Sequence, residues 1–352
     1  MTTLPPSTPF PAAVRDQFAP TVTYLNAPSC GLLPQSAAAA LAAADLQRVT
    51  GEFDIPGVDV VVDECRAVFA RLSGFETRQV AIGSQVSQLI GLIAQSLPPG
   101  ARVVVPEHEF TSVSWPFLAR PDLDVREVPL AGLAAAIRPG DAVVAAAVVQ
   151  SADGAVADMP AVVAAARAAG ARVLFDLSQA VGWLPVRDNG ADWVVSVGYK
   201  WLLGPKGTAF LAGTDAALDT LRPLAAGWYS GYNPWETCYD APLRQAEDAR
   251  RFDVSPAWTM WIGQRPAMAV IEQAGIENIH RYDVALADRL RKGLGLAEGN
   301  SAVVSVRISP EARERVRAAG IVGAVRAGRL RLGCHLYNTE DDIDRALDVL
   351  TG

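Results

Sequence analysis

The chain has 352 residues, half of them apolar, which is enough to bury the core of one large domain and a smaller one. Its 31 basic and 38 acidic residues give a net charge of −7 with no block of like charge, which argues against nucleic acid or a membrane surface as a partner. The N-terminus lacks the regions of a signal peptide, so the expected compartment is the cytoplasm. The scattered cysteines predict reduced thiols and no metal site.

Helical patterns come first in the chain, over residues 34–46 and around 60–72. Short apolar runs typical of buried parallel strands then alternate with helical segments such as 84–97 and 159–170. The runs are 79–83, 102–106, 124–128, 142–149, 172–176, 193–198 and 208–213. This alternation predicts an α/β sheet with helices on both faces.

The pattern changes after about Trp261 to amphipathic helices, two short strands at 301–308 and 329–334, and a closing helix over 341–350. The chain is therefore predicted to form a large domain, 1–262, whose first 20 or so residues are an N-terminal arm, and a small domain, 263–352.

Lysine is scarce in this sequence, which has only Lys200, Lys206 and Lys292. Arginine cannot replace lysine in forming an imine, because its guanidinium stays protonated. An amine at the end of a buried strand therefore indicates covalent chemistry. Lys200 follows the run 193–198, whereas Lys206 lies between Pro205 and Gly207 in a predicted turn that points it to solvent. Lys200 is the better candidate.

Ligands of open α/β sheets bind at the carboxyl ends of the strands, and three more of these ends carry polar or aromatic residues. Ser84 to Ser87 could hold a phosphate or could simply cap a helix. Phe110 could cover a planar ligand or belong to the core. Asp176 ends its run, and a buried acid at such a place requires a partner. A phosphate site, an aromatic ring, a carboxylate and an amine together form the set that pyridoxal 5'-phosphate (PLP) requires.

Six segments resemble the successive signatures of the class V aminotransferase family of PLP enzymes, and they are 24–34, 107–117, 175–186, 196–211, 250–258 and 329–344. The resemblance runs from about Tyr24 to the C-terminus and is closest to the branch similar to isopenicillin N epimerase. The family also includes cysteine desulfurases and kynureninases. The resemblance implies an α/β fold of the fold-type I PLP-dependent transferases, with a mainly parallel sheet flanked by helices in the large domain and a smaller C-terminal α+β domain.

The same resemblance assigns roles around the cofactor. It makes Lys200 the Schiff-base lysine, Asp176 the partner of the pyridine nitrogen, and Gln179 the contact of the phenolic oxygen. It places Phe110 on the ring and a substrate α-carboxylate on Arg331, for which the alternative is a surface salt bridge. The other implied contacts are Gln85, Val86 and Ser87 at the phosphate, Ser196 and Tyr199 beside the lysine, and Asn26 at the substrate.

Ser255 matches a position that reaches the phosphate of a neighbouring subunit, which implies a homodimer with composite active sites. Cys30, Cys334 and His335 stay open as site residues. The aromatic segment 227–239 could cover the substrate or could pack at a dimer interface or an exposed loop.

The resemblance implies an enzyme that acts on an amino acid or amine, with Lys200 removing the Cα proton. Aminotransferase-like activity is preferred. A lyase that eliminates a β-substituent and an epimerase are the alternatives, and a PLP-binding protein without turnover is the alternative of another class. Segment 309–330 has no cysteine, which argues against the persulfide chemistry of cysteine desulfurases.

Overall fold

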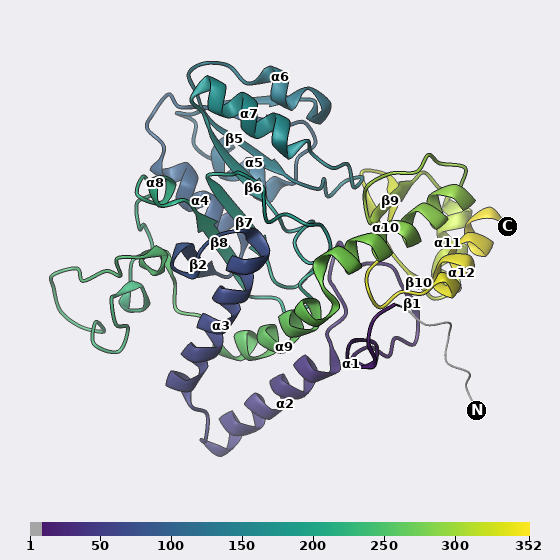
Figure 1. The fold of residues 1–352 in the computed structure, drawn as a ribbon, viewed down its shortest axis with the longest axis horizontal. Helices are drawn as coiled ribbons and strands as arrows, with labels where there is room; N and C mark the ends of the chain where they lie inside the picture. The colour runs from purple at the N-terminus through teal and green to yellow at the C-terminus, as the bar shows by residue number, and fades with distance from the viewer. Residues whose placement is uncertain (1–8) are drawn as a thin grey trace.

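The computed structural model describes residues 9–352. Its large domain is built on a seven-stranded sheet of order β2-β8-β7-β6-β5-β3-β4 (Figure 1). Strands β3 to β7 pair in parallel, and only β8 runs antiparallel to its neighbours β7 and β2. The strands are β2 (Val80–Gly83), β3 (Arg102–Pro106), β4 (Asp124–Val128), β5 (Asp141–Ala147), β6 (Arg172–Asp176), β7 (Trp193–Val197) and β8 (Ala209–Gly213). The predicted strands and the mainly parallel sheet are confirmed.

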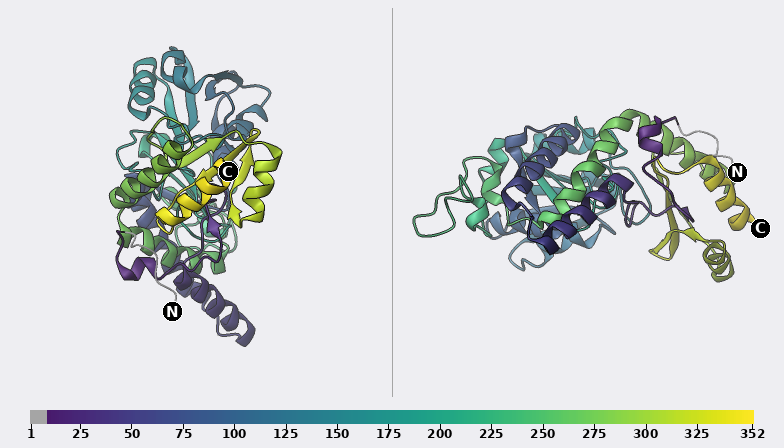
Figure 2. Two further views of the ribbon diagram at one scale, coloured as in Figure 1. Left: turned by 90° about the vertical axis from the view of Figure 1, so that its right-hand side faces the viewer. Right: turned by 90° about the horizontal axis from the view of Figure 1, so that it is seen from below.

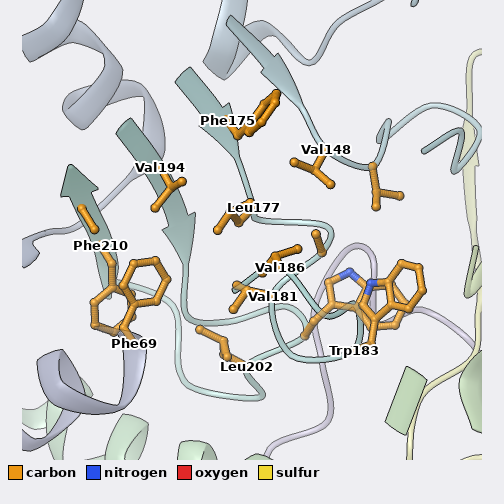
Figure 3. Packing of buried hydrophobic residues seen from close by; sticks show 14 of the residues in the cluster. Phe69, Val148, Phe175, Leu177, Val181, Trp183, Val186, Val194, Leu202 and Phe210 are labelled. Atoms are coloured by element: carbon orange, nitrogen blue, oxygen red, sulfur yellow. The ribbon is translucent and has the colours of Figure 1, made fainter. Parts of the chain in front are cut away.

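Helices cover both faces of this sheet. Strands β2, β7 and β8 are therefore buried at every residue, and neither of their faces is exposed to water. Helices α3, α7 and α9 pack on one face, and α4, α5 and α8 on the other. On the first face Phe69 of α3 stacks on Phe210 of β8, with ring centroids 4.5 Å apart (Figure 3). The helices of the large domain are α1 (Ala12–Arg15), α2 (Gln35–Thr50), α3 (Ile55–Ser73), α4 (Val86–Ser96), α5 (Thr111–Leu118), α6 (Leu133–Ala136), α7 (Met159–Ala169), α8 (Asp215–Leu218) and α9 (Trp258–Ala274).

The ends of the helices follow from local chemistry. Asp158 begins α7 by accepting a hydrogen bond from the Ala161 N–H. Left-handed glycines end several helices, among them Gly51 after α2 and Gly170 after α7. Helix α2 therefore continues past the predicted end at residue 46 until it reaches its glycine. Four 3₁₀ turns add to the domain, η1 (Thr77–Gln79), η2 (Leu130–Gly132), η3 (Trp228–Ser230) and η4 (Ala249–Phe252).

The small domain packs three helices on an antiparallel sheet of order β11-β12-β9 (Figure 2). The N-terminal segment joins it, because β1 pairs in parallel with β10 and Leu25 lies in the small-domain core. The elements are β1 (Thr23–Tyr24), β9 (Val303–Val306), β10 (Ile321–Val322), β11 (Ala324–Arg326), β12 (Arg329–Gly333), α10 (Ile276–Gly293), α11 (Pro310–Ala318) and α12 (Glu340–Thr351).

The expected division at residues 262 and 263 falls inside α9, which packs along α2 and α3 of the large domain. We therefore propose that the boundary lies at Gly275, between α9 and α10, and that residues 23–26 belong with the small domain. Within residues 9–352, no helix combines the length and the apolar character needed to cross a bilayer.

Candidate active site

The carboxyl ends of β3, β6 and β7 meet the start of α4 around a cavity of about 100 Å³. Parallel strands bring these ends to one edge of the sheet, which is why residues far apart in sequence converge there. The cavity is lined by Gln85, Val86, Phe110, Ser112, Asp176, Ser178, Val197, Tyr199, Lys200 and Lys206. Six of the predicted site residues are therefore brought together, and they are Gln85, Val86, Phe110, Asp176, Tyr199 and Lys200.

Lys200 is buried at the end of β7, with only 7% of its surface exposed. Its Nζ lies 5.2 Å from the centroid of the Phe110 ring. Burial lowers the pKa of Lys200 to about 8. The Asp176 carboxylate opposes this fall in pKa, whereas the charges of Arg331 and Arg326 add to it. An appreciable fraction of the amine is therefore neutral and nucleophilic near neutral pH.

A pH dependence follows from this lowered pKa. In cofactor-free protein, reductive methylation of Lys200 by formaldehyde and cyanoborohydride, with the reductant in excess, is expected to accelerate with rising pH and to level off above about pH 8, because only the neutral amine attacks the aldehyde. Peptide mass spectrometry measures the rate at each pH, with the exposed Lys292 as the internal reference. A rate at Lys200 that keeps rising beyond pH 10 would contradict the lowered pKa.

Asp176 is 4% exposed, and no Lys or Arg nitrogen lies within 4 Å of it among residues 9–352. The Ser178 N–H donates to Asp176 Oδ1 at 2.8 Å, and Ser178 Oγ accepts from the Val197 N–H at 3.2 Å. Burial raises the pKa of Asp176, while Lys200 and Ser178 oppose the rise. A carboxylate buried in this way can be stabilised by a positively charged ring nitrogen in the cavity.

The opposite part of the cavity suits an anion. Gln85 caps α4 and Val86 begins it, so the unpaired N–H groups of an 11-residue helix start there. Lys206 is exposed, as its predicted turn requires, but it also lines the cavity. The only sign of that second role in the sequence was the closeness of Lys206 to Lys200.

Four of the predicted cofactor contacts do not line the cavity, and neither do the two predicted substrate contacts, Asn26 and Arg331. Gln179 is held elsewhere, since its Oε1 accepts from Trp201 Nε1 and its Nε2 donates to the Pro28 oxygen, each at 2.8 Å. Ser196 is fully buried and donates to the Val197 oxygen at 3.2 Å. The other two are Ser87 and the exposed Ser255.

Arg331, in β12, is 1% exposed and has no carboxylate within 4 Å among the described residues. Its Nη1 donates to Ser151 Oγ at 2.8 Å, its Nη2 donates to Ser29 Oγ at 2.9 Å, and its Nε has no partner. Burial lowers the pKa of Arg331 to about 10, and the Arg326 charge adds to the fall. The alternative of a surface salt bridge is therefore wrong. The Oδ1 of Asn26 is also buried without a partner, so both groups have unused hydrogen-bonding capacity.

The residues that the sequence left open lie apart from the cavity lining. Cys334 packs in the small-domain core. His335 lies between Asp283 Oδ2, at 2.8 Å from its Nδ1, and the Trp201 oxygen, at 3.1 Å from its Nε2. Burial raises the pKa of the Cys30 thiol, and nearby Lys206 opposes the rise.

The aromatic segment 227–239 packs against the start of α3 rather than over the cavity. The Tyr229 hydroxyl donates to Asp59 Oδ1 at 2.7 Å, and Trp235 Nε1 donates to Asp59 Oδ2 at 3.1 Å. The segment forms part of the loop at the end of the molecule opposite the small domain (Figure 2). The structure therefore does not support the alternative in which segment 227–239 covers the substrate of its own chain.

Glu109 is a buried group that the sequence did not single out. Its Oε1 accepts from the Phe110 N–H at 2.7 Å, and its Oε2 accepts from the Ala147 N–H and Gln150 Nε2 at 2.8 and 2.9 Å. Burial raises the pKa of Glu109, and these hydrogen bonds oppose the rise. The carboxyl group thereby fixes the backbone of Phe110 against the end of β5. The sequence signal that could have identified Glu109 was its position directly before Phe110, the aromatic residue that follows a predicted strand.

The aminotransferase class-V family model matches residues 59–316, and the chain belongs to this family of PLP-dependent enzymes. An uncharacterized aminotransferase from Bacillus subtilis, YcbU, is 26% identical and covers 81% of this chain and 82% of its own. Isopenicillin N epimerase from Streptomyces clavuligerus is 27% identical, over 95% of this chain and 96% of its own.

Solved structures share the fold. A cystine C-S lyase in complex with its product cysteine persulfide has a TM-score of 0.83 and 22% identity, over 94% of this chain and 97% of its own. An apo cysteine desulfurase from Thermococcus onnurineus NA1 has a TM-score of 0.84 and 20% identity, over 97% and 98% of the two chains. The predicted family and fold-type I architecture are confirmed, and the chain is a PLP-dependent aminotransferase or lyase.

The donor set of the cavity fits PLP. An amine is present for its aldehyde, a buried carboxylate for its ring nitrogen, aromatic rings for its plane, and a helix start with Lys206 for its phosphate. Residues 9–352 contain no group of three or more His, Cys, Asp or Glu side chains suited to a metal ion.

Proposed function

We propose that Lys200 holds PLP and transfers the Cα proton of an α-amino acid whose carboxylate binds Arg331, with transamination as the outcome. The observation that carries this proposal is the presence of two buried cations near each other, Lys200 and Arg331. Lys200 is a buried amine with a lowered pKa, and Arg331 is a buried guanidinium without an acid, near enough for its charge to lower the pKa of Lys200.

PLP, when bound, supplies an electron sink for the pair of electrons left at Cα. The Asp176 carboxylate would keep the ring nitrogen positively charged, and Phe110 would lie against the ring. The start of α4 and Lys206 would bind the phosphate. The neutral amine of Lys200 would accept the Cα proton and return it. Arg331, held by Ser29 and Ser151, would orient the carboxylate before the proton moves.

Inversion at Cα is the second candidate, because the similarity to isopenicillin N epimerase extends over 95% of this chain. The lyase alternative is supported for elimination reactions that do not need a protein thiol. Segment 309–330 has no cysteine, and the hairpin of β11 and β12 ends it. Persulfide formation on that segment is therefore not proposed.

We also propose a cytoplasmic homodimer with composite active sites. Ser255 supports it, since this residue is exposed and lies outside the cavity of its own chain, as a residue serving a partner's cavity would. The aromatic segment 227–239 supports it too, since Tyr239 is 82% exposed and Trp235 47%. Analytical ultracentrifugation of the holoprotein tests the dimer.

Product analysis tests the reaction type. The holoprotein is incubated with a panel of L- and D-amino acids and amines, with and without a keto-acid acceptor. Acceptor-dependent keto acid shows transamination, ammonia with a keto acid but no acceptor shows elimination, and an inverted centre shows epimerisation. Absence of any product would favour a binding protein without turnover and would overturn the proposal.

The role of Arg331 gives a separate prediction. Arg331→Ala is expected to raise KM for amino acids on the order of 10- to 1000-fold, because a charge-assisted, two-point contact with the carboxylate is lost. KM for substrates without a carboxylate should change little. The matched control is Arg317→Ala, which removes an exposed guanidinium that pairs with Glu314 on α11. Unchanged kinetics in Arg331→Ala would remove this residue from the site.

A further inference from the structure

Three arginines share one face of the small-domain sheet. Arg331 of β12 lies opposite Ala324 of β11, and Arg329 lies opposite Arg326. Directly paired residues of antiparallel strands point to the same face, and so do alternate residues along one strand. Arg326, Arg329 and Arg331 therefore point to the same side of the sheet, the side on which Arg331 reaches Ser29 and Ser151.

None of these three guanidinium groups has a carboxylate within 4 Å in the part of the chain that the structure describes. Arg317, on the neighbouring helix α11, does pair with an acid, Glu314. Arg329 turns toward β9, where its Nε donates to Ser305 Oγ at 3.0 Å. Arg326 is exposed, and its one hydrogen bond is to the oxygen of its neighbour Val325, at 2.9 Å. Its guanidinium is thus available to a ligand.

Arg326 is also close to Arg331. It is the diagonal neighbour of Arg331 across β11 and β12, which places their Cα atoms about 7–8 Å apart. Its charge lowers the pKa of both Lys200 and Arg331, although neither arginine is among the residues that line the cavity. One arginine is enough to bind one carboxylate. The exposed guanidinium of Arg326, next to Arg331, is therefore not needed for the α-carboxylate.

We propose that the substrate of this site carries a second carboxylate beyond its Cα, and that Arg326 binds it while Arg331 holds the α-carboxylate. This proposal rests on the proposed function and specifies its substrate class as amino acids with an acidic side chain. Arg326 lies next to the hairpin turn of Ala327 and Gly328, where an exposed guanidinium can reach the distal end of a substrate. The planar guanidinium provides two parallel N–H donors for a carboxylate, which an ammonium group does not.

Equilibrium binding to the holoenzyme tests this substrate class without turnover. Isothermal titration calorimetry measures Kd for succinate, glutarate and adipate and for the monoamide of each, which has the same length but one charge less. The wild type is expected to bind the best diacid at least about 10-fold more tightly than its monoamide. Arg326→Gln should reduce that preference to about twofold or less while leaving the monoamide Kd unchanged.

Two controls separate the possible failures. Arg317→Gln removes an exposed arginine of the same domain and should keep the full preference. Arg331→Ala should weaken both diacid and monoamide. A preference that is absent from the wild type, or intact in Arg326→Gln, overturns the inference about the second carboxylate. If the monoamide binds through Arg331 in that case, the proposed function stands; if neither ligand binds and the cofactor band is missing, the proposed function itself fails.

Discussion

Lys200→Ala is expected to abolish detectable turnover, with a loss on the order of 10²–10⁴-fold from the missing proton transfer alone. The protein should also lose its cofactor absorption band at about 400 nm, because no other amine in the cavity follows a buried strand. Lys206 cannot substitute easily, since it lies beyond a turn near the start of α4. Absorbance spectroscopy and the product assay together measure both effects.

The matched control for this variant is Lys292→Ala. Lys292 is the third lysine of the chain and is exposed in the last turn of α10, outside the cavity. Its replacement should leave the absorption band and turnover unchanged. A yellow, active Lys200→Ala protein would show that another group carries the cofactor, and the assignment of the site would be wrong.

The sequence predicted best what depends on strand ends. Asp176 ends a buried run and Lys200 follows one, and a parallel sheet brings such positions to one edge whatever the conformation of the loops. Gln179 shows where such prediction stops, because the sequence cannot tell which of several nearby polar atoms its side chain will bind. In the structure its side chain bonds to Pro28 and Trp201 rather than lining the cavity. Glu109 was missed for a related reason, since its partners Ala147 and Gln150 belong to a different strand and the loop after it.

The pairing of β1 with β10 could not be read from periodicity. These strands have two residues each, and Thr23 pairs with Ile321 from the far end of the chain. A pairing this short gives no alternating pattern, and its stability comes from the surrounding core rather than from its own residues. The N-terminal loop after β1 therefore runs from the small domain to the segment of Tyr199 and Lys200, where the Gly31 N–H donates to the Tyr199 oxygen. Gly31 there approaches the Lys200 oxygen so closely that a side chain would overlap it.

A hydrogen-bonded chain connects the small domain to the lysine segment. Asp283 contacts His335, His335 contacts the oxygen of Trp201, and the Trp201 indole donates to Gln179. Gln179 in turn donates to the oxygen of Pro28 in the N-terminal loop. Every side chain in this series is buried, so each contact is strengthened by the low dielectric around it. Trp201, the residue directly after Lys200, is thereby held from the small domain, and Gln179 is one of the side chains that support it.

Asp253→Ala is expected to lower the free energy of unfolding by about 3–5 kcal/mol. Asp253 and Arg66 form an ion pair, Nη2 to Oδ2 at 2.8 Å, with 2% and 3% of their surfaces exposed. The other carboxylate oxygen accepts from the Ile82 N–H at 2.7 Å, and Arg66 also donates to the Val80 oxygen. The pair thus ties α3 and β2 to the segment that leads into α9. Removal of the carboxylate leaves the buried guanidinium with only the exposed Asp63, 3.3 Å from its Nε, as a counter-charge, and this state is costly.

Urea denaturation at fixed protein concentration measures this loss, with Asp45→Ala as the matched control. Asp45 pairs with Arg48 at 3.5 Å, but both side chains are more than half exposed, so its removal should cost at most about 0.5 kcal/mol. Replacing both Arg66 and Asp253 by apolar residues of similar size should cost less than Asp253→Ala alone, because no buried charge is then left unpaired and Asp63 is exposed to water. Equal losses for Asp253→Ala and Asp45→Ala would show that the buried pair does not hold these elements together.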